Sequence, residues 1–405
     1  MVGVDVGRWR VDPPGRPDGR RTTPWVWPRV VVLLSCALVV ALLEVLVSGC
    51  TERRTSGAPT LGPAPGIAYG PNPDSTPDDA PKGEVVLAFA GDVHFEAHLA
   101  RLLDEPRGAL GPIAETLSAA DVTMVNLESA ITSRGEPEAK ELEAPSRRYH
   151  FRTSPAALDV LAAAGIDLVT MANNHGADFG PVGLEDTLRA IDDSPIPVIG
   201  IGSDQDSAFA PHRVSIRGTD VAFLAADGSM REGASDVWAA GPDNPGVAAA
   251  HSERPRALLR AVRSASETDD VVVVYLHWGA ELESCPTPQQ QGTARALAEA
   301  GADIVVGTHA HVPLGSGWLG DTYVNYGLGN FLWYHDRRPE SGVLQVRIED
   351  GAVVDGSWAP AEIQPDGRPV PIIGADREAA EADWRRLRGC TGLAEAPELA
   401  GPQGL

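Results

Sequence analysis

Lysine is almost absent from this 405-residue sequence, and basic residues as a class are scarce. Lys and Arg together number 33 against 56 Asp and Glu, for a formal net charge of −23, and the lysines are Lys82 and Lys140. Proteins that hold nucleic acid without regard to its sequence bind the phosphate backbone through clustered Lys and Arg. The sequence therefore excludes that class, and we expect no nucleic-acid partner.

Cysteine is also rare, and the four present are too few for a disulfide scaffold. Cys36 and Cys50 belong to the N-terminal region, which leaves Cys285 and Cys390 in the body of the chain. In an oxidising compartment these two could pair and fix the last helix near the loop that follows His277, and two free thiols are the alternative. With 43% hydrophobic and 22% charged residues, the composition is that of a globular protein and excludes wholesale disorder.

An apolar run from Val30 to Val47 follows a basic stretch and ends in Ser48-Gly49-Cys50. Such a run is either a membrane span or the core of a secretory signal. Its ending resembles the bacterial lipobox, so we predict that residues 1–49 are a lipoprotein signal peptide and that Cys50 is lipidated. An uncleaved N-terminal membrane anchor is the alternative, although Glu44 within the run favours cleavage. Both interpretations place the remaining chain outside the cytoplasm, attached to the cell membrane.

Residues 50–83 are rich in Pro and Gly and have no periodic apolar face, which predicts a linker. From Glu84 onward, short β-branched runs alternate with Ala/Leu-rich stretches, a pattern typical of a layered α/β domain, which we place at residues 84–365. Residues 366–405 are expected to form a C-terminal helix, Asp376–Arg388, and a tail. The segments Gly342–Ile348 and Ala352–Trp358 predict a hairpin. The expected strands are Val85–Ala90, Val122–Leu127, Leu168–Met171, Pro197–Ile201, Val221–Ala225, Val271–Leu276, Asp303–Val306 and Thr322–Tyr326, and the expected helices are Ser154–Ala164, Gly183–Ile191, His251–Ala265 and Thr287–Ala300.

Polar side chains follow several of these strands directly. In an open α/β sheet the carboxyl ends of the strands share one edge, so residues far apart in sequence converge there. A single histidine after a strand is more often a hydrogen-bonded turn residue than a ligand. Five histidines at such ends, together with carboxylates and amides, match what a divalent transition metal requires. The converging residues are Asp92, His94, Asn126, Glu128, Asn173, Asn174, His175, His277, His309 and His311.

The ordered motifs GDVHF, VNLES, ANNHGADFG, LHWGAE, AGADIVVGTHAHV and NYGLGNF resemble the CapA family, which is associated with poly-gamma-glutamate capsule synthesis. That family belongs to the calcineurin-like metallophosphoesterases, and the resemblance covers Glu84 to Ile363. It implies a four-layer α/β/β/α sandwich, a metallo-dependent phosphatase-like fold, with two divalent metal ions (Mn, Fe or Zn) at the strand ends.

The same resemblance implies the ligand sets. One metal would be held by Asp92, His94, Glu128 and His311, and the other by Glu128, Asn174, His277 and His309. Asp92 and His94 lie two apart on an expected extended segment, as do His309 and His311, so each pair should point to one side. Two such ions share and activate a water molecule.

His175 resembles the general acid that protonates the leaving oxygen. The wider superfamily has an Asp where this chain has Glu128, which leaves open whether Glu128 bridges two metals.

Asn126 and Asn173 are expected beside the ligands. The other features have two interpretations each. Glu281 is either a solvated residue or an acid that orients a ligand, and Asn330 is either a turn former or a cleft residue that meets substrate. Arg147, Arg148 and Tyr149 lie in the insertion Thr132–His150, which is either a solvated loop or a lid that supplies positive charge.

We therefore expect a membrane-tethered extracytoplasmic hydrolase in which metal-activated water attacks a phosphoester or an amide. The expected context is synthesis of a capsule or another surface polymer, with an anionic polymer or phosphoester substrate and a capsule synthesis complex as partners. A non-catalytic metal-binding scaffold in a polymer synthesis or export complex is the alternative. Removal of the leader, which carries six Arg and four acidic residues, changes the net charge from −23 to −25. An anionic substrate would thus need local capture.

Overall fold

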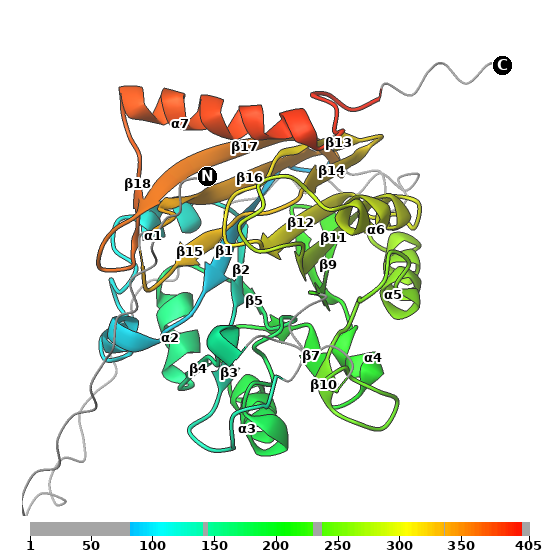
Figure 1. The fold of residues 1–405 in the computed structure, drawn as a ribbon. Helices are drawn as coiled ribbons and strands as arrows, with labels where there is room; N and C mark the ends of the chain where they lie inside the picture. Colours follow the sequence, from blue (N-terminus) through cyan, green and yellow to red (C-terminus); the bar gives the residue numbers. More distant parts are fainter. Residues whose placement is uncertain (1–81, 141–144, 230–236, 336, 399–405) are drawn as a thin grey trace, which may run out of the picture. The chain divides into compact units, whose positions relative to one another are not determined.

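The computed structural model describes residues 82–140, 145–229, 237–335 and 337–398 (Figure 1). The predicted signal peptide, the lipidation site Cys50 and nearly all of the predicted linker lie outside these residues. Within the described part of the chain, no helix combines the length and apolar character needed to cross a membrane.

The first sheet mixes parallel and antiparallel strands in the order β18-β17-β16-β1-β2-β5-β6, with β15 beside β1. Strands β1, β2, β5 and β6 run parallel, whereas β16, β17 and β18 are antiparallel. The predicted hairpin is confirmed as β16 and β17. The bounds are β1 Val85–Val93, β2 Val122–Leu127, β5 Leu168–Thr170, β6 Val198–Ile199, β15 Asn330–Leu332, β16 Glu340–Glu349, β17 Ala352–Ile363 and β18 Pro369–Pro371.

The second sheet has the order β13-β14-β12-β11-β9-β8. Its central strands β9, β11, β12 and β14 run parallel, and the edge strands β8 and β13 are antiparallel to their neighbours. The bounds are β8 His212–Ile216, β9 Thr219–Gly228, β11 Val271–Trp278, β12 Ile304–His309, β13 Ser316–Leu319 and β14 Thr322–Asn325; the short pairs β3 Ala130–Ile131 with β4 Arg152–Thr153, and β7 Ile201–Gly202 with β10 Gly246–Val247, lie outside both sheets.

The two sheets pack face to face. Alternate residues of β1 and β11, such as Phe89 and Tyr275, belong to the apolar core between the sheets, and the Tyr275 hydroxyl donates to the carbonyl oxygen of Ala90 at 2.6 Å. The intervening residues, such as Ala88 and Val274, belong to the two outer cores. Strands buried on both faces read as continuous apolar runs, which explains why the sequence reveals them.

Helices cover the outer face of each sheet and complete the expected α/β/β/α order. Figure 1 shows α5 and α6 on one side of the strands and α1 and α2 on the other. Thr287 caps α6 and forms a capping box with Gln290, as a Thr before a helical run predicts. The bounds are α1 Ile113–Leu117, α2 Ala156–Ala163, α3 Gly180–Asp192, α4 Gln205–Ala208, α5 Arg256–Ser266, α6 Pro288–Ala298 and α7 Ala375–Arg386, with 3₁₀ segments η2 Ala97–Leu103, η3 Pro145–Arg147 and η4 Leu387–Cys390.

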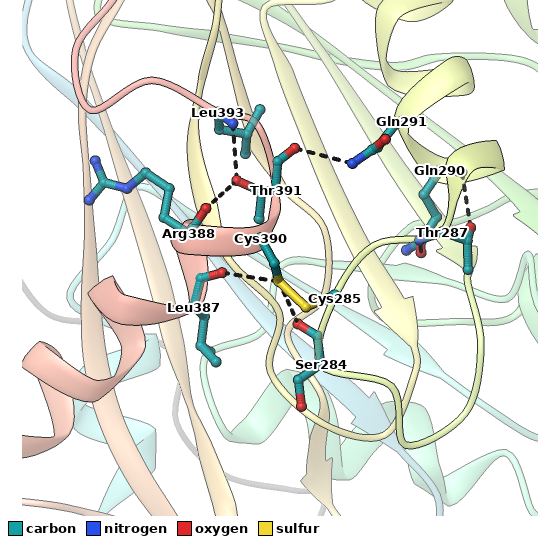
Figure 2. The surroundings of a disulfide bond; sticks show 10 residues. All are labelled: Ser284, Cys285, Thr287, Gln290, Gln291, Leu387, Arg388, Cys390, Thr391 and Leu393. Carbon is teal, nitrogen blue, oxygen red and sulfur yellow. Dashed lines mark hydrogen bonds between the residues drawn. A yellow bond between two sulfur atoms is a disulfide. The ribbon is translucent and has the colours of Figure 1, made fainter.

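The C-terminal helix α7 packs on β17, as Figure 1 shows at the top of the molecule. Trp384 of α7 stacks on Trp358 of β17 with ring centroids 5.4 Å apart. After the helix, Cys390 forms a disulfide with Cys285 from the loop between β11 and α6 (Figure 2). Of the two alternatives left open by the sequence, paired and free thiols, the structure shows the pair.

Candidate metal centre and active site

The strand registers bring polar side chains from both sheets to one edge. In the first sheet Asp92 of β1 lies opposite Asn126 of β2 and opposite Asn330 of β15. In the second sheet Trp278 of β11 lies opposite His309 of β12. His277 is the residue before Trp278 on β11, so it lies close to His309. The carboxyl ends of parallel strands therefore meet as expected, although the structure extends β1, β11 and β12 to include the polar residues themselves.

His277 and three other buried residues meet at the His277 imidazole. Its Nε2 lies 2.7 Å from Asn174 Oδ1, 3.0 Å from His309 Nδ1 and 3.4 Å from Glu128 Oε1. These residues come from the ends of β2, β5, β11 and β12, so both sheets contribute. They are the four residues predicted for one of the two metals.

Asp92 lies beside this cluster and is held by neutral donors. Its Oδ1 accepts from Asn126 Nδ2 at 2.8 Å, and its Oδ2 accepts from the backbone N–H of His309 at 3.1 Å. Asn173 Nδ2 in turn donates to Asn126 Oδ1 at 2.9 Å. Asp92 Oδ2 also lies 3.6 Å from His311 Nδ1. Asn126 and Asn173 thus orient Asp92, the kind of support that metal ligands require.

The surroundings of the Glu128 carboxylate favour the binding of a cation. Its side chain is fully buried, and neither carboxylate oxygen has a hydrogen-bond partner among the described residues. Glu128, His309 and His311 each offer a ligand atom within 4.8 Å of the other two. A buried carboxylate without such a partner is costly, and a carboxylate with imidazole nitrogens is a donor set suited to Mn, Fe or Zn. The residues present therefore fit a divalent metal.

The pKa values of His277 and Asp92 also indicate that the cluster favours a bound cation. Burial alone lowers the pKa of His277, but the carboxylates of Glu128 and Asp92 raise it to about 10. Burial raises the pKa of Asp92, but the nearby imidazole of His277 lowers it below its ordinary value. Carboxylates that attract a proton this strongly also attract a metal cation, which competes with that proton.

His94 is buried in an aromatic setting at the end of β1. Its ring stacks on Phe151 with centroids 4.8 Å apart and meets Trp333 edge-on at 4.4 Å. Nδ1 accepts from the backbone N–H of Glu96 at 3.0 Å, and Nε2 has no partner in the described part of the chain. Burial lowers the pKa of His94 well below its ordinary value, which keeps the imidazole neutral. Its role as a metal ligand stays a prediction.

His309 and His311 do not lie on one extended segment, so that prediction is wrong. Both residues have positive φ, 85° for His309 and 57° for His311, so the chain turns there instead of continuing as a strand. Their ring centroids nevertheless lie 6.0 Å apart. A left-handed conformation at a non-glycine residue costs about 1–3 kcal/mol and is found most often at functional sites.

His175 faces the cluster and is held from behind by a buried carboxylate. Its Nε2 lies 3.7 Å from Glu128 Oε1, and its Nδ1 lies 2.6 Å from Asp178 Oδ2. Asp178 also accepts from the backbone N–H of Phe151 at 2.7 Å and pairs with Lys140 at 2.8 Å. An Asp–His contact of this kind fixes the tautomer and orientation of the ring.

Sequence reasoning missed Lys140 and Asp178. Asp178 lies three residues after His175, within the quoted motif ANNHGADFG, and that spacing was the available signal. Lys140 comes from the insertion Thr132–His150 and is one of two lysines in a chain of 405 residues, so its rarity was the signal there. The Lys140 side chain is fully buried.

A cavity of about 170 Å³, here called the site cavity, opens beside the cluster. Asn330 lines it, and Asn330 Oδ1 lies 2.8 Å from His311 Nδ1; contact of Asn330 with substrate stays a prediction. Tyr149 of the insertion lines it too, whereas the side chain of Arg147 lies outside the described residues. The lining residues are Tyr149, Phe151, His175, Glu281, Leu282, His311, Asn330, Trp333, Tyr334, His335 and Arg338.

The sequence model of the bacterial capsule synthesis protein family PGA_cap matches residues 86–335, well over half of the chain and all of the segments that build the cluster. The chain belongs to the PGA_cap family.

Relatives of this PGA_cap protein carry related names. It is 25% identical to the capsule biosynthesis protein CapA of Bacillus anthracis, over 72% of this chain and 70% of the relative. It is 27% identical to the PGA biosynthesis protein CapA of Bacillus subtilis, over 70% of this chain and 73% of the relative. A probable polyglutamine synthesis accessory protein of Mycobacterium tuberculosis is 32% identical over 48% of this chain and 51% of its own.

Solved structures give weaker likenesses to this PGA_cap protein. A phosphatase from Mycoplasma pneumoniae has 14% identity and a TM-score of 0.42, with 69% of this chain and 94% of the other covered. A putative 5'-nucleotidase from Staphylococcus aureus has 18% identity and a TM-score of 0.43, with 75% of this chain and 58% of the other covered.

Proposed function

We propose that this PGA_cap protein is a metal-dependent hydrolase that acts outside the cytoplasm on a phosphoester or amide bond. The observation that carries the proposal is Glu128, whose buried carboxylate has no hydrogen-bond partner among the described residues and lies next to His277, His309 and His311. Asn174 and Asp92 complete a set of oxygen and nitrogen donors. Such a set holds one or two divalent ions, with His94 as a further ligand.

The bound metal would lower the pKa of a water molecule so that it acts as a nucleophile near neutral pH. The chain's own residues do the rest. The contact between His175 Nδ1 and Asp178 leaves Nε2 on the side of the cluster, where it holds a proton for the leaving oxygen. Asn126 and Asn173 keep Asp92 in place, and Phe151 and Trp333 shield this edge of the cluster from water.

The cellular context is part of the proposal. The Bacillus relatives are named for capsule and PGA biosynthesis, which supports a role in the synthesis of a capsule or another surface polymer. The apolar run and Cys50 support attachment to the cell membrane through a lipid anchor. An anionic polymer or a phosphoester would be the substrate, and a polymer synthesis complex the partner.

The test is hydrolysis by the purified full chain loaded with Mn²⁺, Fe²⁺ or Zn²⁺. Bis(p-nitrophenyl) phosphate and a γ-glutamyl oligomer serve as substrates. We expect turnover with at least one metal, loss of turnover in His309→Ala, and a decrease of about 10²- to 10⁴-fold in His175→Ala because a general acid contributes that much. His98→Ala is the matched control, since His98 is exposed on η2. Absence of turnover with every metal would contradict the proposal and favour a non-catalytic scaffold.

A further inference from the structure

A second cavity of about 300 Å³ lies under α7, and we call it the α7 cavity. Its walls come from β16, β17 and α7 and from the segment after His311. Most of the lining is hydrocarbon, supplied by residues such as Val312, Pro313, Trp358, Ile372, Trp384 and Leu387. Neither the metal cluster nor His175 lies in this cavity, so the proposed chemistry does not account for it.

The α7 cavity adjoins the site cavity. Arg338 lines both. His311 lines the site cavity, and the next two residues along the chain line the α7 cavity. Across the same boundary, Ser341 Oγ of the α7 cavity donates to the backbone oxygen of Asn330 of the site cavity at 2.8 Å. The two cavities are therefore neighbours, and Arg338 lies at the boundary between the cluster side and the apolar space.

The charged side chains that line the two cavities favour one kind of ligand over another. Arg338 is exposed and makes no ion pair within the described part of the chain, so its guanidinium is available to an anion at the boundary. Among the described residues, the two cavities are lined by the carboxylates of Glu281, Glu340 and Asp383. Their other ionisable side chains are Arg338, histidines and tyrosines. A polyglutamate chain would place a carboxylate near these groups at every residue, whereas a hydrocarbon chain places none.

A disulfide joins two of the segments that line the α7 cavity. Ser284 and Leu387 line it, and each lies next to the Cys285–Cys390 disulfide, which joins the two segments (Figure 2). The stacked Trp358 and Trp384 form another part of the wall. A cavity that is already formed binds an apolar group without the cost of ordering its walls.

We infer that the substrate is an amphiphilic phosphoester, with its phosphate at the cluster, an anionic oxygen at Arg338, and its hydrocarbon chain in the α7 cavity. The inference rests on the proposed function, because it takes the cluster to be the phosphate site. It departs from polyglutamate as the molecule that is hydrolysed.

The experiment is calorimetric binding of methyl, butyl and octyl phosphate to the full chain loaded with Mn²⁺. We expect affinity to rise with chain length, by up to about fourfold for each methylene that is buried. Ala380 lines the cavity from α7, so Ala380→Leu should shorten the space and weaken this dependence while methyl phosphate binding is kept. Ala379→Leu, at an exposed neighbouring position on α7, is the matched control and should keep the dependence.

Arg338→Gln provides a second variant that does not disturb packing, because Arg338 is exposed. It should weaken all three phosphates by a similar factor of about tenfold or more and leave the chain-length dependence intact. Methyl phosphate binding without any chain-length dependence would overturn the inference and leave the proposed function standing. A dependence that persists in Ala380→Leu, or a γ-glutamyl trimer that binds more tightly than octyl phosphate, would also overturn it. Failure of methyl phosphate itself to bind would contradict the phosphoester form of the proposed function and the inference together.

Discussion

The buried ion pair between Lys140 and Asp178 gives a sharp prediction about stability. Both side chains are at most 1% exposed, and Lys140 Nζ lies 2.8 Å from Asp178 Oδ1. Burial raises the pKa of Asp178, but the charges of His175 and Lys140 lower it below its ordinary value, so the carboxylate is ionised at neutral pH. Lys140→Met replaces the ammonium with an apolar chain of similar length and leaves that carboxylate without its cation.

The expected loss follows from what Asp178 retains. Breaking one side of a buried ion pair costs about 3–5 kcal/mol, because it leaves a buried charge uncompensated. Asp178 keeps the backbone N–H of Phe151 and the ring of His175 as partners, so we expect a value near the lower end, about 3 kcal/mol. In Lys140→Met with Asp178→Asn both charges are gone, and the loss should fall short of the sum of the single losses by about 1 kcal/mol or more.

Urea unfolding of the full chain at pH 7, followed by tryptophan fluorescence and circular dichroism, measures these free energies. Lys82→Met is the matched control, since the chain's other lysine pairs with Asp270 where both side chains are about a quarter exposed, and its loss should stay below about 1 kcal/mol. A loss below about 1 kcal/mol for Lys140→Met, or additive losses in the double variant, would refute the reasoning.

Two further predictions concern positions away from the cluster. Replacing Cys285 and Cys390 by Ser removes a disulfide that spans 105 residues, and the free energy of unfolding should fall by up to about 4.7 kcal/mol in urea titrations; an unchanged midpoint would contradict this. Burial raises the pKa of Asp303 to about 6, above its unfolded value, so this group lowers stability as pH rises from 4 through 6. Asp303→Asn should therefore stabilise the protein at pH 7.5 by up to about 3 kcal/mol and have little effect at pH 4, as thermal unfolding at both pH values would show.

The central strands could be predicted because they are buried on both faces. Val122–Leu127 is mostly apolar, and the structure gives β2 the same bounds with every residue buried. The short strand β15 gave no such signal: it is three residues long, lies in a glycine-rich segment and pairs with β1 where Asn330 lies opposite Asp92. Its pairing depends on the tertiary arrangement, which no local pattern encodes.

The cluster could be predicted in part for the same reason. Residues at the ends of parallel strands converge by topology, so His277, His309 and Glu128 were found from their positions alone. Lys140 was not, because it comes from an insertion without hydrophobic periodicity and reaches Asp178 through tertiary packing. The positive φ at His309 and His311 could not be read from residue type either, since few non-glycine residues of any type adopt it.

The claim that Glu128 and its neighbours bind a divalent metal is tested most directly by calorimetric titration of the full, metal-stripped chain with Mn²⁺, Fe²⁺ and Zn²⁺. Glu128→Gln keeps the shape of the side chain and removes its charge, and Glu362→Gln, at an exposed position on β17, is the matched control. We predict one or two bound ions in the unmodified chain and in Glu362→Gln, and an affinity at least about tenfold weaker in Glu128→Gln. Equal affinity and stoichiometry in Glu128→Gln would contradict the account.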